Sequence, residues 1–380
     1  MLIEKNTIYF PSLNGIRFIA ATLVFVHHFV GFNFFRKSTG YQMESDFFSP
    51  MGGTGVTLFF VLSGYLITYL LLTEYKVESK ISIRNFYIRR LLRIWPLYFF
   101  TIAINLLYSY FMSTLSTDFF TTKFLLYIFF LPNIASIIFI SGGFPTQLWS
   151  VGTEEQFYLF WPWLISLFYR RIKWVLIFIP ILFLVLRFGL NICLINMKTP
   201  LIIKGVNIID FLTSFVCNFR IDCMAIGGGF AWLLFNKHKS LKIIYSKPIQ
   251  VMALIITVLL IFLGFNSSAI NFPLYSLLFG IIIINISANR MSVLSLKNRF
   301  FEELGKISYG LYVFHPLILM MVEKYIERKG IYSLWVIFLA FVISFGLNIF
   351  ISYLSFKYIE NPFLKLKYKF SKILSGNDIK

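Results

Sequence analysis

Apolar residues occur along the chain in long stretches, which polar and basic residues separate. A helix needs roughly 20 predominantly apolar residues to cross the hydrocarbon core of a bilayer. Eleven stretches reach or approach that length: 13–35, 55–73, 87–112, 124–140, 151–169, 174–196, 210–236, 248–266, 271–288, 307–326 and 331–356. No segment between them is long enough for a soluble domain. The pattern predicts an all-α, polytopic integral membrane bundle in which residues 1–380 form a single domain.

Lysine and arginine residues between these stretches predict how the chain is oriented, because such residues are enriched in cytoplasmic loops. If all eleven stretches cross the membrane, the basic residues at 170–173 fall outside the cell; if 124–140 does not cross, every basic cluster falls inside. That stretch is short and is followed by a helix-breaking Ser-Gly-Gly-Phe-Pro run. We therefore predict about ten transmembrane helices, cytoplasmic termini, and a re-entrant or outer-face segment over 113–148. A re-entrant segment implies a cavity, because non-helical backbone is not tolerated against lipid.

Composition agrees with a membrane protein and excludes several other classes. The chain is 58% hydrophobic and 13% charged, whereas soluble domains have roughly 25% charged residues. The net charge of +19 does not indicate nucleic acid, because the basic residues punctuate apolar stretches; it favours contact with anionic lipids. The three cysteines form no CxxC pattern and have no paired histidine, so neither a disulfide framework nor a metal site is expected. The first stretch contains Arg17 and lacks a small-residue cleavage site, which indicates a retained helix.

Ionisable residues inside a membrane span are costly and by default mark functional sites. In the first stretch, Asn14, Arg17 and His28 fall on one stripe of a helix, and His27 lies on another face. At 1.5 Å per residue, His28 lies about 16 Å beyond Arg17. The stripe could bind neighbouring helices together. Alternatively, His28 is placed for proton transfer, because its pKa lies nearest neutrality.

A second group is the arginine cluster at the start of the third stretch. Arg90 and Arg93 are three residues apart and share a helical face at the predicted inner boundary. Positive-inside anchoring explains part of this cluster. Arginine also presents a planar fork of donors that suits phosphate groups, and coenzyme A is a cytoplasmic ligand with three phosphates. A cytoplasmic acyl-CoA site is therefore the alternative interpretation.

A third group opens the stretch 151–169, where Glu154 follows Trp149 and Ser150. Acidic residues are favoured at a helix N-terminus, and Thr153 could act as its cap. A carboxylate can also orient an imidazole and stabilise its charged form. With the predicted topology, Glu154 should lie at the depth of His28 and could orient it.

The remaining polar residues inside spans are more readily explained as structural. Arg220 and Asp222 are two residues apart, so each should pair with a different helix; Arg17 is one candidate partner of Asp222. Ser63 and its neighbouring glycine could narrow a helix contact or line a channel, and no GxSxG elbow surrounds the serine. A single histidine before proline, His315, is more often structural.

Several blocks occur in a characteristic order: LNGIRFIAATLVFVHH, GVTLFFVLSGYLIT, FYIRRLLRIWP, LWSVGTEEQFYLFWP, RIDCMAIGGG, ISYGLYVFHP and ENPF. In this order the chain resembles the membrane-bound acyltransferases of family 3, which O-acylate surface glycans and related molecules. The resemblance implies roles for Arg17 and His28, for the pair Arg90 and Arg93, and for Glu154. Asn14 stands where the family usually has Asp. Relatives that acetylate peptidoglycan often carry an additional SGNH-type domain; because this sequence ends at Lys380, stand-alone transfer is expected.

The resemblance implies an O-acyltransferase of the bacterial cytoplasmic membrane. Acyl-CoA, most simply acetyl-CoA, would bind at Arg90, Arg93 and Arg17, and no metal is expected. His28 would act as base for a glycan hydroxyl on the outer face, or would itself carry the acyl group. Succinyl transfer remains open at this point. The alternative is a transporter or flippase of a lipid-linked glycan, although the sequence shows no internal symmetry of the kind found in many transporters.

Overall fold

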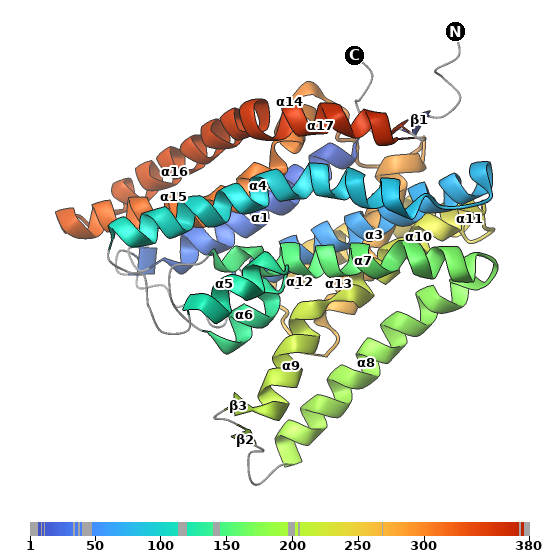
Figure 1. Ribbon diagram of the computed structural model, residues 1–380, viewed down its shortest axis with the longest axis horizontal. Helices are drawn as coiled ribbons and strands as arrows, with labels where there is room; N and C mark the ends of the chain where they lie inside the picture. The colour runs from blue at the N-terminus through green and yellow to red at the C-terminus, as the bar shows by residue number, and fades with distance from the viewer. Residues whose placement is uncertain are drawn as a thin grey trace.

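The computed structural model describes residues 7–8, 10, 12–32, 35–36, 39, 48–112, 120–139, 145–196, 202–203, 206–267, 269–371 and 374–375. The long helices lie roughly along one axis, except Ile172–Asn196, which runs obliquely away from it (Figure 1). They are α1 (Leu13–Gly31), α3 (Met51–Glu78), α4 (Ile83–Phe111), α7 (Trp149–Phe168), α8 (Ile172–Asn196), α10 (Ile221–Phe235), α12 (Lys247–Phe262), α13 (Asn271–Ala288), α15 (Ser308–Lys329) and α16 (Leu334–Ser355). The shorter helices are α5 (Phe120–Ile128), α6 (Pro132–Ile138), α9 (Ile208–Phe219), α11 (Leu241–Ile244), α14 (Arg299–Lys306) and α17 (Asn361–Lys367).

Regular β-structure in the described residues is limited to two pairs of two-residue strands. β1 (Thr7–Ile8) pairs in parallel with β4 (Leu374–Ser375), and β2 (Ile202–Ile203) pairs with β3 (Val206–Asn207) in antiparallel fashion. The all-α prediction is therefore confirmed. The β1–β4 pair also places the first and last described segments together at one end of the bundle.

Six continuous helical stretches of the described residues are long and apolar enough to cross a membrane, or seven if the bent pair α14 and α15 counts as one. A polytopic membrane protein is confirmed, but a count of about ten is not. The stretch Thr146–Asn196 is counted once although it contains α7 and α8, which reverse direction at a short 3-10 turn, η4 (Tyr169–Arg171) (Figure 1).

Two other predicted stretches are also interrupted. The stretch 210–236 breaks at Arg220, whose φ of 32° lies in the left-handed region and separates α9 from α10. The stretch 124–140 forms α5 and α6, of 9 and 7 residues, on either side of Phe130 with its φ of 57°. Neither short helix reaches the roughly 20 residues of a span, so this segment does not form one crossing helix, as expected.

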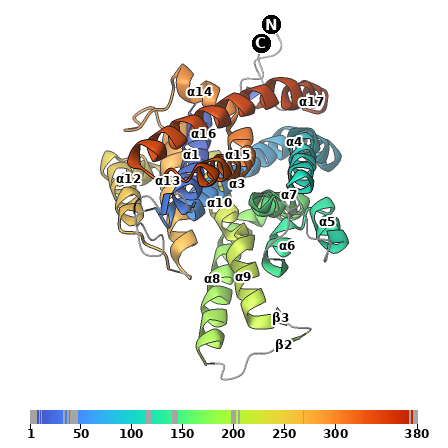
Figure 2. The same cartoon turned by 90° about the vertical axis from the view of Figure 1, so that its left-hand side faces the viewer.

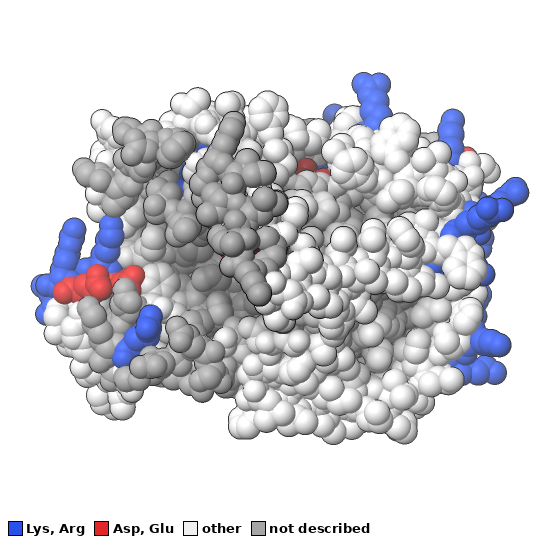
Figure 3. All heavy atoms as spheres, turned by 90° about the horizontal axis from the view of Figure 1, so that it is seen from below, with Lys and Arg blue, Asp and Glu red and all other residues white. Residues whose placement is uncertain are grey.

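The outer surface of the bundle is apolar, as contact with lipid requires. Leu167, Phe178 and Trp335 are more than 60% exposed, and they lie on the outward faces of three peripheral helices. On the face seen in Figure 3, Lys and Arg stand at both ends, with Asp and Glu among them at the left-hand end, and few charged side chains occur between the two ends. The right-hand end is the one where α3 passes into α4 and α7 into α8 (Figure 1). On this face, surface charge therefore lies mainly at the two ends of the long axis.

The centre of the bundle is formed by α1, α3, α10 and α13, with α4, α8, α12 and α16 around it (Figure 2). Helices α3 and α10 approach each other closely at two glycines. A Cβ atom at Gly64 would lie 1.9 Å from the carbonyl oxygen of Met224, and one at Gly227 would lie 2.1 Å from that of Val61. Each glycine thus faces the backbone of the other helix. This confirms that the glycine next to Ser63 narrows a helix contact, which was one of the two alternatives for that segment.

Substitution of Gly227 by Ala should therefore destabilise the bundle. The added methyl group meets backbone, which cannot move aside as a side chain can, so we expect a loss of at least about 1–3 kcal/mol. The measurement is the yield of monodisperse protein after detergent extraction, together with its thermal unfolding midpoint. Gly229→Ala is the matched control, because nothing lies within 4 Å of a Cβ at that position. Equal yields of the two variants would contradict the close approach of α3 and α10.

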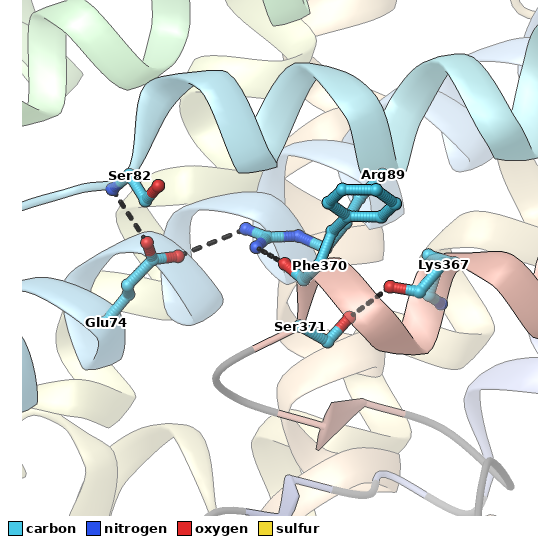
Figure 4. Close-up of polar contacts among 6 residues, drawn as sticks. All are labelled: Glu74, Ser82, Arg89, Lys367, Phe370 and Ser371. Atoms are coloured by element: carbon cyan, nitrogen blue, oxygen red, sulfur yellow. Dashed lines mark hydrogen bonds and ion pairs between the residues drawn. The ribbon is translucent and has the colours of Figure 1, made fainter.

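Hydrogen bonds and an ion pair of Arg89 hold the C-terminal segment against the start of α4. Arg89 donates to the carbonyl oxygen of Phe370 at 2.8 Å and pairs with Glu74 at 3.1 Å. The other Glu74 oxygen accepts the backbone N–H of Ser82 at 2.8 Å, as Figure 4 shows. Glu74 is 3% exposed. One buried carboxylate thereby fixes the turn between α3 and α4 and, through Arg89, holds the C-terminal segment beside it.

Candidate functional site

A cavity of about 180 Å³ lies among α1, α3, α4, α7 and α15. Its polar lining comes from helices that are far apart in the sequence. The charged and hydroxyl-bearing lining residues are Arg17, Ser63, Arg90, Arg93, Ser150, Glu154, Tyr158, Ser308, Tyr309 and Tyr312. Ile8, Phe10 and Leu70 also line it, so the cavity extends toward the basic end of the bundle. The three arginines and the glutamate that the sequence singled out thus lie around one space.

Arg17 is positioned by its own helix. Its guanidinium donates to the side-chain oxygen of Asn14 at 2.8 Å, one turn earlier. Asn14 also lines the cavity, and α14 approaches its backbone closely: a Cβ at Gly305 would lie 2.1 Å from the Asn14 carbonyl oxygen. The amide therefore still positions Arg17, although it lacks the charge of the usual aspartate.

Arg90 and Arg93 have no hydrogen bond or ion pair with any described residue. The Arg90 guanidinium lies over the rings of Phe86 and Tyr158, 5.7 and 5.4 Å from their centroids, and its buried Nε has no hydrogen-bond partner. Arg93 is attracted at longer range by Glu360, at the end of the π-helical turn η5 (Phe356–Glu360). Guanidinium groups in a membrane interior are costly without partners. The site is therefore poised to receive an anion.

Glu154 is held by hydroxyl groups. Ser63 donates to one of its oxygens at 2.9 Å, and Tyr158 donates to the other at 3.0 Å. Within the described lining of the cavity, Glu154 is the only carboxylate beside three arginines. Ser63 therefore lines the cavity and also bonds directly to Glu154. These bonds fix the carboxylate at the Arg17 end of α1.

The expectation that Glu154 lies at the depth of His28 and orients it is wrong. His28 does not line the cavity, and it lies about 16 Å further along α1 than Arg17. Its Nδ1 donates to the carbonyl oxygen of Val24 at 2.8 Å, and its ring lies 4.8 Å from the ring of His315. The predicted topology put Glu154 at an outer boundary, but α7 begins inside the protein, where Trp149 contacts the buried Arg220.

A hydroxyl pair in the lining of the cavity includes Tyr312, whose backbone is bonded to His315. Ser150 and Tyr312 share a 2.6 Å hydrogen bond, and the Tyr312 hydroxyl lies 2.9 Å from the carbonyl oxygen of Gln147. Both hydroxyl residues line the cavity. The backbone of Tyr312 accepts a 2.7 Å hydrogen bond from Nδ1 of His315. The cavity and His28 are thus connected through Tyr312 and His315.

Arg220 and Asp222 belong to a separate buried cluster. The suggested pairing of Asp222 with Arg17 is wrong, because Asp222 forms two bonds of 2.6 and 2.8 Å with Arg187 of α8. Arg220 donates to the Gly53 carbonyl oxygen at 3.1 Å, and its guanidinium lies 3.6 Å from the ring centroid of Phe272. Both residues therefore pair with other helices, as expected, and Asp222 has the structural ion pair that the sequence favoured.

Sequence reasoning missed several residues of these two clusters. Arg187 interrupts an apolar stretch, and that signal alone could have identified it. Tyr158 and Tyr312 gave no signal, because tyrosine is common throughout this chain. His315 was interpreted as structural because it is a single histidine before a proline. Among the described residues, no group of three or more His, Cys, Asp or Glu side chains is placed to hold a metal ion.

Comparison with known proteins identifies the family. A family model described as an acyltransferase domain matches residues 10–356 of the chain. The chain belongs to acyltransferase family 3. The match covers all five cavity-forming helices and also His28 and His315. No solved structure gives a significant match.

Curated relatives of this family 3 protein include bacterial O-acetyltransferases. The peptidoglycan O-acetyltransferase OatA of Listeria monocytogenes is 29% identical over 377 residues, which cover 94% of this chain and 56% of that protein. The O-acetyltransferase OatA of Staphylococcus aureus is 28% identical over 378 residues, which cover 95% and 58%. The chain therefore spans little more than half the length of these curated relatives.

Proposed function

We propose that this family 3 protein transfers an acyl group, most simply acetyl, from cytoplasmic acyl-CoA to a hydroxyl of an extracytoplasmic glycan. The observation that carries the proposal is the cavity lined by Arg17, Arg90 and Arg93, whose described lining holds a single carboxylate, that of Glu154. Two of these arginines lack hydrogen-bond partners among the described residues. An anionic ligand would supply the missing partners.

Phosphate groups fit these unpaired arginines. Three guanidinium groups and one carboxylate leave an excess of two positive charges in the cavity. Guanidinium binds phosphate oxygens through paired, charge-assisted hydrogen bonds. Acyl-CoA has both phosphate groups and a reactive thioester, whereas free phosphate has no acyl group to transfer. Acyl-CoA is therefore the ligand we favour.

The size of the cavity favours a donor that enters only in part. Sites that enclose a complete drug-sized ligand measure about 300–1,000 Å³, and this cavity measures about 180 Å³. We infer that it holds the pantetheine arm and the phosphates nearest to it, with the nucleotide at the basic end of the bundle. By the positive-inside rule that end is cytoplasmic, which is where acyl-CoA occurs.

His28 lies toward the other end of α1, where an extracytoplasmic acceptor would approach. Because a carbonyl oxygen can only accept, Nδ1 of His28 carries the proton of its bond to Val24, and Nε2 keeps a free lone pair. In the proposed reaction Nε2 takes the proton of the acceptor hydroxyl. The hydroxyl oxygen bonds to the acyl carbon, the carbon–sulfur bond breaks, and the thiolate then receives the proton. The Ser150–Tyr312 pair lines the cavity, and we propose that the thioester passes it on the way to His28.

The named activities of the relatives support a glycan acceptor. One relative is named a peptidoglycan O-acetyltransferase and another an O-acetyltransferase. Both matches cover the cavity and the histidines of this chain, since each spans at least 94% of it. We therefore propose a surface glycan such as peptidoglycan or an O-antigen as the acceptor class.

Purified protein in detergent or vesicles, supplied with radiolabelled acetyl-CoA and glycan acceptor, tests this proposal. Arg93→Gln should raise KM for acetyl-CoA by about 10- to 100-fold, because one charge-assisted phosphate contact contributes about 1.5–3 kcal/mol. The same variant should leave KM for S-acetylpantetheine unchanged, because that donor has no phosphate. Arg84→Gln is the matched control, since Arg84 lies on the same helix and is exposed.

Three outcomes of this assay bear on the proposal. Transfer of label to the glycan supports an acyltransferase. If acetyl-CoA remains intact while labelled lipid-linked glycan crosses the vesicle membrane, the flippase alternative replaces it. If Arg93→Gln impairs both donors equally, phosphate is not what Arg93 binds, and the donor orientation proposed here is wrong.

A further inference from the structure

The interior contains a second histidine beside the proposed base. His315 of α15 is fully buried, and its ring centroid lies 4.8 Å from that of His28. Its Nδ1 donates to the carbonyl oxygen of Tyr312 at 2.7 Å, so Nε2 is the unprotonated nitrogen of the neutral ring. This buried Nε2 has no hydrogen-bond partner among the described residues. A buried polar atom without a partner is costly and calls for an explanation.

The two histidines are arranged alike. In each ring Nδ1 is committed to a backbone carbonyl of the same helix, at 2.8 Å for His28 and 2.7 Å for His315. Each ring therefore offers a lone pair at Nε2 and no second donor. His27, whose ring lies 5.1 Å from that of His28, is bonded separately to the carbonyl oxygen of Phe48 at 3.0 Å. The described surroundings place no carboxylate in hydrogen-bonding contact with His28.

The two histidines differ in how exposed their side chains are. His28 is partly exposed, whereas His315, whose ring lies beside it, is fully buried. Only His28 can therefore touch an acceptor hydroxyl. His315 can act on the reaction only through His28.

We propose that His315 is a positioning residue that stabilises the protonated form of His28 during acyl transfer, in place of the carboxylate used by hydrolase triads. The inference rests on the proposed function. When the hydroxyl O–H bond breaks, Nε2 of His28 gains the proton and the ring becomes positively charged. Once the hydroxyl oxygen has bonded to the acyl carbon, it holds that proton weakly. Nε2–H of His28 can then donate to the lone pair on Nε2 of His315 until the leaving thiolate takes the proton.

A neutral histidine suits this position better than a carboxylate would. A buried carboxylate has to be desolvated and needs a permanent partner, whereas a neutral imidazole carries no charge in the resting protein. It supplies an acceptor only when His28 becomes charged, and a hydrogen bond to a charged group is the stronger kind. The arrangement thus stabilises the reaction intermediate more than the resting state.

His315→Asn separates this role from a structural one. The Asn amide nitrogen can keep the bond to the Tyr312 carbonyl oxygen, but the side chain lacks the nitrogen that corresponds to Nε2. We expect kcat to fall by about 10- to 100-fold with KM for acetyl-CoA unchanged, because a hydrogen bond to a charged group is lost. His27→Asn is the control, since it preserves the bond to Phe48 in the same way; its kcat should stay within about twofold of wild type.

A double variant shows whether His315 acts through His28. In the His28→Ala background, His315→Asn should cause no further loss, whereas a purely structural effect would add to the first. The inference is overturned if His315→Asn, folded as judged by size-exclusion chromatography, keeps the wild-type kcat, or if its effect persists without His28. If wild-type protein transfers no label from acetyl-CoA, the proposed function itself fails, and that result is distinguishable from both.

Discussion

Replacing His28 with Ala is expected to lower glycan acylation by about 10²- to 10⁴-fold, the contribution of a positioned general base. The structure supports this role through the Nδ1–Val24 bond, which holds the ring and leaves Nε2 free. The variant should still insert and fold, because His28 is partly exposed and its only described hydrogen bond is to its own helix. The measurement is the O-acetyl content of surface glycans, by mass spectrometry, in a deletion strain complemented with each variant.

His27→Ala provides the comparison on the adjacent position. His27 lies on another face of α1 and bonds to Phe48. Wild type and His27→Ala should restore acetylation, and His28→Ala at equal expression should not. If His28→Ala also restores it, the enzyme class stands but the base is another residue. If no variant changes acetylation, the acceptor or the acyl group differs from our proposal.

The second large effect is expected at the Arg187–Asp222 pair, and it concerns folding. Both side chains are at most 1% exposed, and their closest bond is 2.6 Å. Asp222→Ala leaves a guanidinium uncompensated inside the bundle, which costs about 3–5 kcal/mol for a buried pair. We expect a severe loss of monodisperse protein and a lower unfolding midpoint. Replacing both partners together, as Arg187→Met with Asp222→Leu, should recover much of the loss, because no lone charge then remains.

A surface pair of the same chain is the control. Glu303 and Lys306 are bonded at 2.8 Å, but their side chains are 58% and 30% exposed. Exposed pairs contribute about 0–1 kcal/mol, so Glu303→Gln should scarcely change the midpoint. An Asp222→Ala variant as stable as Glu303→Gln would show that the buried pair does not hold α8 against α10.

Individual residues show how far sequence could lead. Arg17, Arg90, Arg93 and Glu154 were recognisable because charge is rare in apolar stretches, and all four line one cavity. The hydrogen-bonding partners of buried charged residues were harder to predict from the sequence. Ser63 lies 91 positions from Glu154, and Arg187 lies 35 from Asp222. Periodicity gives the face that a residue occupies on its own helix, but it does not say which helix lies opposite.

The same limit explains the misplaced Glu154. Hydropathy assigns a residue to a stretch, and the stretch was assumed to begin at the membrane boundary. Instead α7 begins beside the buried Arg220, after the short helices α5 and α6. Mean hydropathy does not show that a helix begins inside the protein. Glu154 was therefore expected beside His28, whereas it lies beside Arg17.

The sequence by itself determined that this chain is an all-helical membrane protein, because a bilayer permits few alternatives to helices of about 20 apolar residues. It also indicated which charges require a functional or structural explanation. Only the tertiary structure decided which charges meet. The close approach of α3 and α10 at Gly64 and Gly227 and the proximity of His28 and His315 both depend on residues far apart in the sequence. Such contacts arise from helix packing, which is set by the complementarity of whole surfaces and by close approach at small residues.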